Sequence, residues 1–227
     1  MEKYVYKMFF DVDYSKYGIN EGTIREIIMT YYLHKINSNI IPKMRKYVIN
    51  LQNIGIRSNS EMGIVMDKYD CSLNSLDFKV LKMNDFISIS KQLMEHLCSW
   101  GLNGVVHGDF KTANAVINLQ TSRIKIIDWG MARVKYNLNK YCSDHNTVTL
   151  WYRDPMLISN NYFMVDHIKS DIWAVGVTIL ELWCSMKGIT FPFISSNEVK
   201  LMKNICELLG KPNQSEFPYL KHLDLIY

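Results

Sequence analysis

Apolar residues in the first part of the chain recur with two different periods, which predict a strand followed by a helix. Residues 4–10 are rich in aromatic and β-branched side chains, and the two-residue period of a strand places Val5 and Lys7 on the same face. Over residues 23–39 apolar side chains return every three or four positions, which predicts a helix that carries Glu26.

The rest of the pattern predicts a few more strands and then mainly helices. Shorter apolar runs indicate strands, and a turn-rich stretch after the second of them, residues 67–72, is a candidate linker between two lobes. Gly130 to Pro155 form a long connection, and connections of that length are uncommon unless they have a function. The expected strands are 47–51, 63–66 and 124–127, and the expected helices are 84–100, 171–183 and 196–209.

Composition indicates the general class of protein but not its activity. The 227 residues are 48% hydrophobic and 21% charged with a net charge of +4, which is ordinary for a folded globular protein and gives no reason to expect a nucleic-acid partner. Five cysteines without a C-x-x-C pair favour a reducing compartment. We find no signal peptide and no apolar run of spanning length, and so expect a soluble protein without a membrane partner, located in the cytoplasm or nucleus (of a host cell if the source is viral).

The candidate chemistry is concentrated in two short motifs. The stretch H-G-D-F-K-T-A-N at residues 107–114 places Asp109, Lys111 and Asn114 in one loop, and Asp128 follows an apolar run at a glycine turn. Two oxygen ligands, a spare carboxylate and a lysine are what a site for Mg²⁺ and a nucleotide requires. A pair of ordinary turns between strands is the alternative.

These motifs resemble those of the eukaryotic protein kinases, and in particular the cyclin-dependent group. Residues 107–114 are similar to the H-R-D-L-K-x-x-N catalytic loop, and D-W-G at 128–130 is similar to D-F-G. The stretch T-L-W-Y-R-D-P at 149–155 resembles T-L-W-Y-R-A-P-E, and D-I-W-A-V-G at 171–176 resembles the F-helix that anchors the catalytic loop. Residues 18–26 resemble the entry to a PSTAIRE-type C-helix.

The resemblance implies an α+β, two-lobed protein-kinase-like fold in a single domain, with ATP and Mg²⁺ between the lobes. Residues 1–69 would form a reduced N-lobe of a few strands plus the C-helix, and residues 70–227 a mainly helical C-lobe without the last helices of the family.

The resemblance also implies a role for each candidate residue. Asp109 would accept the proton of the substrate hydroxyl, Lys111 would steady the phosphoryl group, and Thr149 would bridge the two. Asn114 and Asp128 would ligate Mg²⁺. The nucleotide-binding residues would be Lys7 paired with Glu26 at the phosphates, Met66 as gatekeeper, Asp67 and Tyr69 through backbone groups, and Val5 and Val116 on either side of the adenine ring. Without the other motifs, we would interpret Lys7 and Glu26 as a solvated strand lysine and a surface helix carboxylate.

A second family shares part of the pattern. The sequence H-G-D-x-x-x-x-N followed by Asp-Trp is also similar to aminoglycoside and choline phosphotransferases, and Gly108 by itself favours them. Those enzymes lack the T-L-W-Y-R-x-P block and the D-I-W-A-x-G helix, and we therefore favour the protein kinases.

The sequence also departs from the kinase pattern. The given chain begins at the lysine strand and contains no glycine-rich phosphate loop, so we expect weak ATP binding and slow transfer. Met156 stands where the family has a glutamate that pairs with an arginine of a later segment not found here. Gly108 replaces the arginine that reads a phosphate on the activation loop, and we hypothesise that Asp144 pairs with Arg25 and Arg133 as a permanent substitute.

The sequence therefore predicts a weakened serine/threonine protein kinase that acts on a protein substrate. The alternative is a catalytically impaired kinase-like protein that binds a partner kinase or regulatory subunit. A cyclin-like or kinase partner would dock at the helix that contains Thr23–Glu26.

Overall fold

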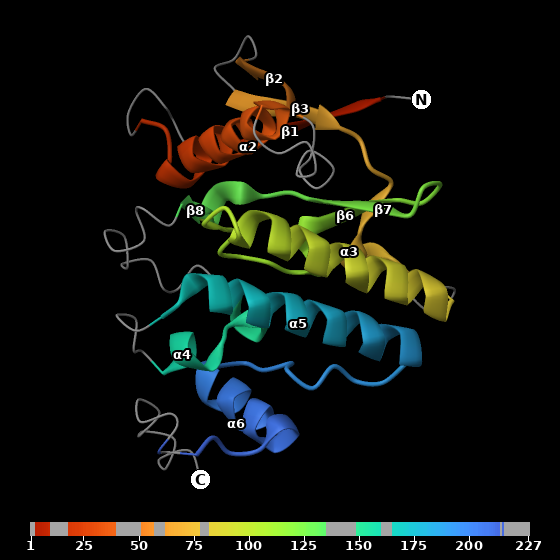
Figure 1. Cartoon of the computed structure of the whole chain (residues 1–227), viewed down its shortest axis with the longest axis vertical. Coiled ribbons are helices and arrows are strands. Elements are labelled where there is room, and N and C mark those ends of the chain that lie inside the picture. The colour runs from red at the N-terminus through yellow and green to blue at the C-terminus, as the bar shows by residue number, and fades with distance from the viewer. Residues whose placement is uncertain are drawn as a thin grey trace.

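The computed structural model describes residues 3–9, 18–39, 51–56, 62–77, 82–134, 149–159, 165–213 and 215. A small sheet and one helix lie at one end of the molecule, and most of the helices lie at the other end (Figure 1). The α+β, two-lobed arrangement expected from the sequence is therefore observed.

The small lobe consists of β1 (Tyr4–Met8), α2 (Glu21–Asn39), β2 (Leu51–Ile56) and β3 (Met62–Asp67). Its strands form an antiparallel sheet in the order β1-β3-β2. A compact apolar cluster of Phe9, Leu51, Ile64 and Met66 is buried under this sheet. The strand expected at 47–51 overlaps β2 only at Leu51, because residues 40–50 lie outside the described part of the chain.

Helix α2 carries apolar side chains on two opposite faces, and its inner face also buries polar ones. The face toward the protein buries Thr23, Glu26, Met29, Thr30 and Leu33, while Ile24, Ile28, Tyr31 and Tyr32 on the opposite face are 40–57% exposed. The apolar period that predicted this helix therefore comes largely from its outer face, and Glu26 lies on the inner one.

The large lobe is built on helices α3 (Met83–Gly101), α5 (His167–Lys187) and α6 (Glu198–Leu209), with the short α4 (Pro155–Ile158) beside α6 (Figure 1). Its small sheets are β4-β6-β7 and β5-β8. The remaining elements are β4 (Cys71–Ser72), β5 (Val105–Val106), β6 (Ala115–Asn118), β7 (Arg123–Ile126), β8 (Arg133–Val134) and the 3₁₀ turns η2 (Leu73–Ser75), η4 (Thr112–Asn114), η5 (Trp129–Met131) and η8 (Leu150–Tyr152). The predicted helices agree with α3, α5 and α6, whereas β6, the two-residue strands and α4 were not anticipated.

Local capping explains why α5 is longer than its apolar run. The Asp166 carboxylate accepts hydrogen bonds from the backbone N–H groups of Ile168 and Lys169, so the helix begins four residues before Asp171. Gly188 ends the helix in a left-handed conformation. None of the helices in the described ranges is long and apolar enough to cross a membrane.

Candidate active site

One ion-pair chain connects the small lobe to the turn after β7. Lys7 Nζ on β1 lies 2.5 Å from Glu26 Oε1 on α2 and 3.5 Å from Asp128 Oδ1. The Glu26 side chain is only 6% exposed, and this burial raises the pKa of its carboxyl, although the adjacent Lys7 ammonium opposes the shift. Lys7 and Glu26 are therefore not a solvated lysine and a surface carboxylate, as the simpler reading of the sequence had allowed.

Asp109, Lys111 and Thr149 form a closed hydrogen-bonded group. Lys111 Nζ lies 2.6 Å from Asp109 Oδ2 and donates to Thr149 Oγ1 over 2.7 Å. Thr149 in turn donates to Asp109 Oδ1 from both its N–H and its hydroxyl, at 3.1 and 3.0 Å. The beginning of the segment before α4 is thus tied directly to the loop between β5 and β6.

Asn114 completes this loop from within. Its side-chain Nδ2 donates to the Asp109 carbonyl over 2.9 Å, and the residue is 5% exposed. Because the amide nitrogen is held in this way, the side-chain oxygen Oδ1 points away from the Asp109 carbonyl. The orientation of Asn114 Oδ1 is therefore fixed before a metal ion binds.

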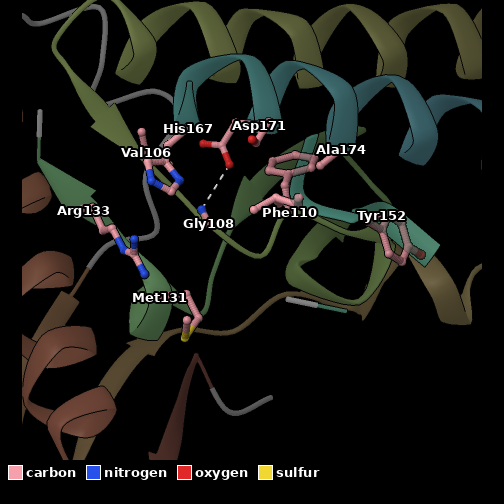
Figure 2. Close-up of a pocket in the computed structure, with 11 residues that line it drawn as sticks. Val106, Gly108, Phe110, Met131, Arg133, Tyr152, His167, Asp171 and Ala174 are labelled. Atoms are coloured by element: carbon pink, nitrogen blue, oxygen red, sulfur yellow. Dashed lines mark hydrogen bonds between the residues drawn. The ribbon is translucent and has the colours of Figure 1, made fainter. Parts of the chain in front are cut away.

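The loop is anchored on α5 through a buried carboxylate. Asp171 accepts hydrogen bonds from the backbone N–H groups of His107 and Gly108 at 2.6 and 3.0 Å. Figure 2 shows the Asp171 carboxylate directed at Gly108. Burial raises the pKa of Asp171 to about 7, and the two N–H donors limit the shift.

His107 is a structural part of the loop. Its Nε2 lies 3.1 Å from the Ile127 carbonyl, and its Nδ1 accepts the Asp109 N–H over 3.3 Å. Complete burial lowers the pKa of the imidazole, so the ring is neutral with the proton on Nε2. The histidine thereby links the loop that carries Asp109 to the residue that precedes Asp128.

The Asp128 turn is strained and held by aromatic packing. Asp128 has φ 66° and ψ 68°, a left-handed conformation that costs a non-glycine residue about 1–3 kcal/mol and is common at functional sites. The next residue, Trp129, is completely buried, with its ring centroid 4.7 Å from that of His107 and 5.2 Å from that of Trp100. This packing fixes the turn, while the Asp128 side chain stays 43% exposed.

The residues expected near adenine lie on β1, β3 and β6 and on the segment that follows β3. Val5 pairs with Met66 across the sheet, and strand alternation places Val5 on the same side as Lys7. Met66 is buried and Val5 is 43% exposed. Val116 on β6 and Tyr69 are partly buried against the small-lobe cluster. The Asp67 side chain accepts a hydrogen bond from Gln52.

Gly108 has a backbone that an arginine could not adopt without rearrangement. Its φ is +82°, and a Cβ built on it would lie 2.6 Å from the Met131 carbonyl oxygen. Gly108 and Met131 line a small, mostly apolar cavity together with Arg133, His167 and Asp171 (Figure 2). The glycine is therefore required by the local packing of η5 against the loop.

The segment after Thr149 is fastened to α5 and α6. Tyr152 donates from its hydroxyl to Glu181 over 2.5 Å, and Arg153 pairs with Glu198 at 2.5 Å. Trp151 Nε1 donates to the Ser195 carbonyl over 2.9 Å. These contacts were not foreseen, although a lone carboxylate such as Glu181 in an apolar helix is a signal of a buried polar partner.

Of the residues linked to departures from the kinase pattern, the structure places Met156 and Arg25. Met156 lines an apolar groove with Trp173 and Met202, where an apolar side chain fits. Arg25 is bonded to Gly130 and Glu21. Asp144, the suggested anionic partner of Arg25, lies outside the described residues.

A comparison with known families decides between the two phosphotransferase patterns. The family model described as Protein kinase domain matches residues 2–223. The chain belongs to the protein kinase family. Within that family its sequence similarity lies with the cyclin-dependent kinases: it is 24% identical to a cyclin-dependent kinase 4 homolog of Caenorhabditis elegans over 88% of this chain and 47% of that protein. It is 29% identical to cyclin-dependent kinase 7 of Dictyostelium discoideum over 88% of this chain and 51% of that protein.

Solved structures show the same fold. The yeast RNA polymerase II CTD kinase CTDK-1 complex matches with a TM-score of 0.75 at 23% identity, over 98% of this chain and 67% of that chain. The CAK complex of Chaetomium thermophilum bound to ATP-γ-S matches with a TM-score of 0.74 at 20% identity, over 96% of this chain and 64% of that chain. The kinase chain described here spans about half of the length of the two sequence relatives above.

The residues present fit ATP with Mg²⁺. The candidate metal ligands, Asn114 Oδ1 and the Asp128 carboxylate, are hard oxygen donors of the kind that Mg²⁺ prefers. Asp128 is partly exposed, and the cationic Lys7 beside it can contact phosphate oxygens.

Proposed function

We propose that this kinase-family chain is a serine/threonine protein kinase that transfers the γ-phosphoryl group of ATP to a protein hydroxyl. The observation that carries the proposal is the closed group of Asp109, Lys111 and Thr149, which holds a carboxylate and an ammonium side by side at one end of the loop. Lys7, fixed by Glu26 and Asp128, supports the same conclusion from the small lobe.

The proposed roles follow from what each group can do at its position. Asp109 orients the substrate hydroxyl and takes its proton, because Lys111 and Thr149 leave its carboxylate little freedom to rotate. Lys111 offsets the negative charge of the phosphoryl group in the transition state of transfer. Bound Mg²⁺, held by Asn114 and Asp128, would neutralise charge on the β- and γ-phosphates. Lys7 would contact the α- and β-phosphates, and Val5, Met66, Asp67, Tyr69 and Val116 would surround the adenine.

The proposal is tested by a transfer assay with radiolabelled ATP and a generic protein substrate. The Asp109→Asn variant should lose at least about a hundredfold in rate, the scale of general-base catalysis. Thr149→Ser should retain most of the activity, because serine keeps the hydroxyl that bridges Asp109 and Lys111, whereas Thr149→Val should not. Transfer by these 227 residues should be slow, since they contain no glycine-rich loop.

A second function is favoured by one specific observation, the exposed apolar face of α2. Ile24, Ile28, Tyr31 and Tyr32 form a continuous stripe on the solvent side of the helix. An apolar stripe of this kind fits the complementary surface of a protein partner, and we propose a cyclin-like subunit or a second kinase as the occupant. This function would be favoured by two results together. The wild type would show no transfer above the Asp109→Asn background, and it would bind a partner that Ile28→Asp no longer binds. The location of this protein in the cytoplasm or nucleus stays a prediction.

A further inference from the structure

Two adjacent residues of α2 hold opposite ends of the turn formed by Asp128, Trp129 and Gly130. Glu26 fixes Lys7, which lies 3.5 Å from the Asp128 carboxylate. Arg25, the preceding residue, donates from Nη1 to the Gly130 carbonyl over 3.2 Å. The first turn of α2 also approaches closely, since a Cβ on Gly130 would lie 3.5 Å from the Gly22 carbonyl oxygen.

The charge of Arg25 is balanced within the same helix. Its Nη2 forms an ion pair with Glu21, one helical turn earlier. The Arg25 side chain is 21% exposed, while Glu21 lies farther out at 68%. One guanidinium therefore contacts the Glu21 carboxylate with Nη2 and the Gly130 carbonyl with Nη1, a contact from two separate nitrogens that the single nitrogen of a lysine cannot reproduce.

Gly108 provides no side chain that could bind an anion together with Arg25. In the kinases that this chain resembles, an arginine at that position reads a phosphate on the following segment. Here the position is a glycine in a left-handed conformation whose Cβ direction is blocked by the Met131 carbonyl. Arg25 is thus bonded to the Glu21 carboxylate of its own helix and to the Gly130 carbonyl of the turn.

We propose that Arg25 is a positioning residue for the Asp128 turn and that Glu21 is its built-in anion, so that the turn is held by a carboxylate of the same helix. Arg25 would orient Asp128 through Gly130. It would thereby affect metal binding without contacting the metal itself. The inference rests on the proposed function only where it concerns Mg²⁺.

The first measurement needs no ligand. Hydrogen exchange on the nucleotide-free chain should show faster exchange of residues 128–131 in Arg25→Lys, which keeps the charge but has one nitrogen in place of the two that contact Gly130 and Glu21. Exchange in α3 and α5 should stay as in the wild type, which separates a local role from general destabilisation. Glu21→Gln should show the same effect to a smaller degree, because an exposed ion pair contributes less than a hydrogen bond from a charged group.

The second measurement is the Mg²⁺ dependence of ADP binding. Arg25→Lys should need roughly tenfold more Mg²⁺ for half-maximal binding, a change of the size expected from one lost charged hydrogen bond, with ADP binding in EDTA unchanged. Glu207→Gln is the matched control, because Lys203 and Glu207 form an exposed pair at the same spacing on α6. That variant should behave as wild type.

Three outcomes separate the possibilities. Wild-type exchange and Mg²⁺ dependence in Arg25→Lys would overturn the proposal. A shift of phosphatase-treated wild type to the Arg25→Lys values would also overturn it, since a phosphate would then be the anion. A wild type that binds no ADP with Mg²⁺ would contradict the proposed function, while the exchange experiment would still decide the role of Arg25.

Discussion

At the residue scale, Gly108 is fixed by two separate constraints, its backbone conformation and the Met131 carbonyl beside it. We predict that Gly108→Ala lowers the free energy of unfolding by about 2–4 kcal/mol, the combined cost of a left-handed alanine and a close contact. Gly108→Arg, which restores the familiar kinase residue, should be at least as destabilising. Urea unfolding of both variants checks this.

Two other glycines provide controls for Gly108. Gly188 has φ +66° with no atom within 4 Å of a built Cβ, so Gly188→Ala should cost only the conformational part, about 1–2 kcal/mol. Gly176 lies in the interior of α5 with open space around it, and Gly176→Ala should stabilise by about 0.5–1 kcal/mol. Equal losses at positions 108 and 188 would contradict the steric part of the argument.

Asp171 should give the protein a distinctive pH dependence. Its carboxyl has a pKa of about 7 in the folded chain against 3.8 ordinarily, because it is buried. Between these pH values the native state holds a proton that the unfolded state has released. The contribution of Asp171 to the free energy of unfolding is therefore fully present below pH 3.8 and is lost as pH rises through 7.

The test compares wild type with Asp171→Asn between pH 5 and 8. The asparagine variant is expected to be less stable throughout, because its amide cannot accept both N–H groups. The difference in unfolding free energy should shrink with rising pH, by at most about 1.4 kcal/mol per unit, and level off above pH 8. Ile89→Val, a core change without a titratable group, should show a constant difference.

At the scale of elements, α2 carries apolar side chains on two opposite faces, one buried against the protein and one exposed. Leu33 on the inner face is 1% exposed, and Ile28 on the outer face is 57% exposed. We predict that Leu33→Ala lowers the free energy of unfolding by about 2–5 kcal/mol, whereas Ile28→Ser leaves it within about 0.5 kcal/mol. Thermal or urea unfolding of the isolated chain measures both. A large loss in Ile28→Ser would mean that the outer face is packed in the folded chain.

At the scale of the whole molecule, Lys7, Glu26 and Asp128 connect the lobes through charged contacts that a bound nucleotide would reinforce. Saturation with Mg²⁺ and ATP at a hundred times its dissociation constant should stabilise the chain by about 2.7 kcal/mol. Lys7→Met should remove most of this gain, because the phosphates would lose their cation. A melting temperature that rises equally in Lys7→Met would contradict the placement of the phosphates beside Lys7.

The sequence alone predicted the parts of the molecule whose signals are local. Helices α3, α5 and α6 follow from apolar periodicity, and the motifs at 107–114 and 128–130 follow from residue types at short spacing. Those signals are encoded within a few residues of the chain, so a single sequence is enough to reveal them. The protein kinase family and its two-lobed fold followed from the order of these motifs.

Only the tertiary structure decided which groups meet across long separations. The outward orientation of Ile28, the bonds of Arg25 to Glu21 and Gly130, and the burial of Asp171 under His107 and Gly108 depend on how the helices pack. Helical spacing shows that a stripe exists but not which face is covered, because burial is a property of neighbours that lie far away in sequence. Likewise, the letter G at position 108 indicated a lost arginine, and only the backbone beside Met131 showed why none fits there.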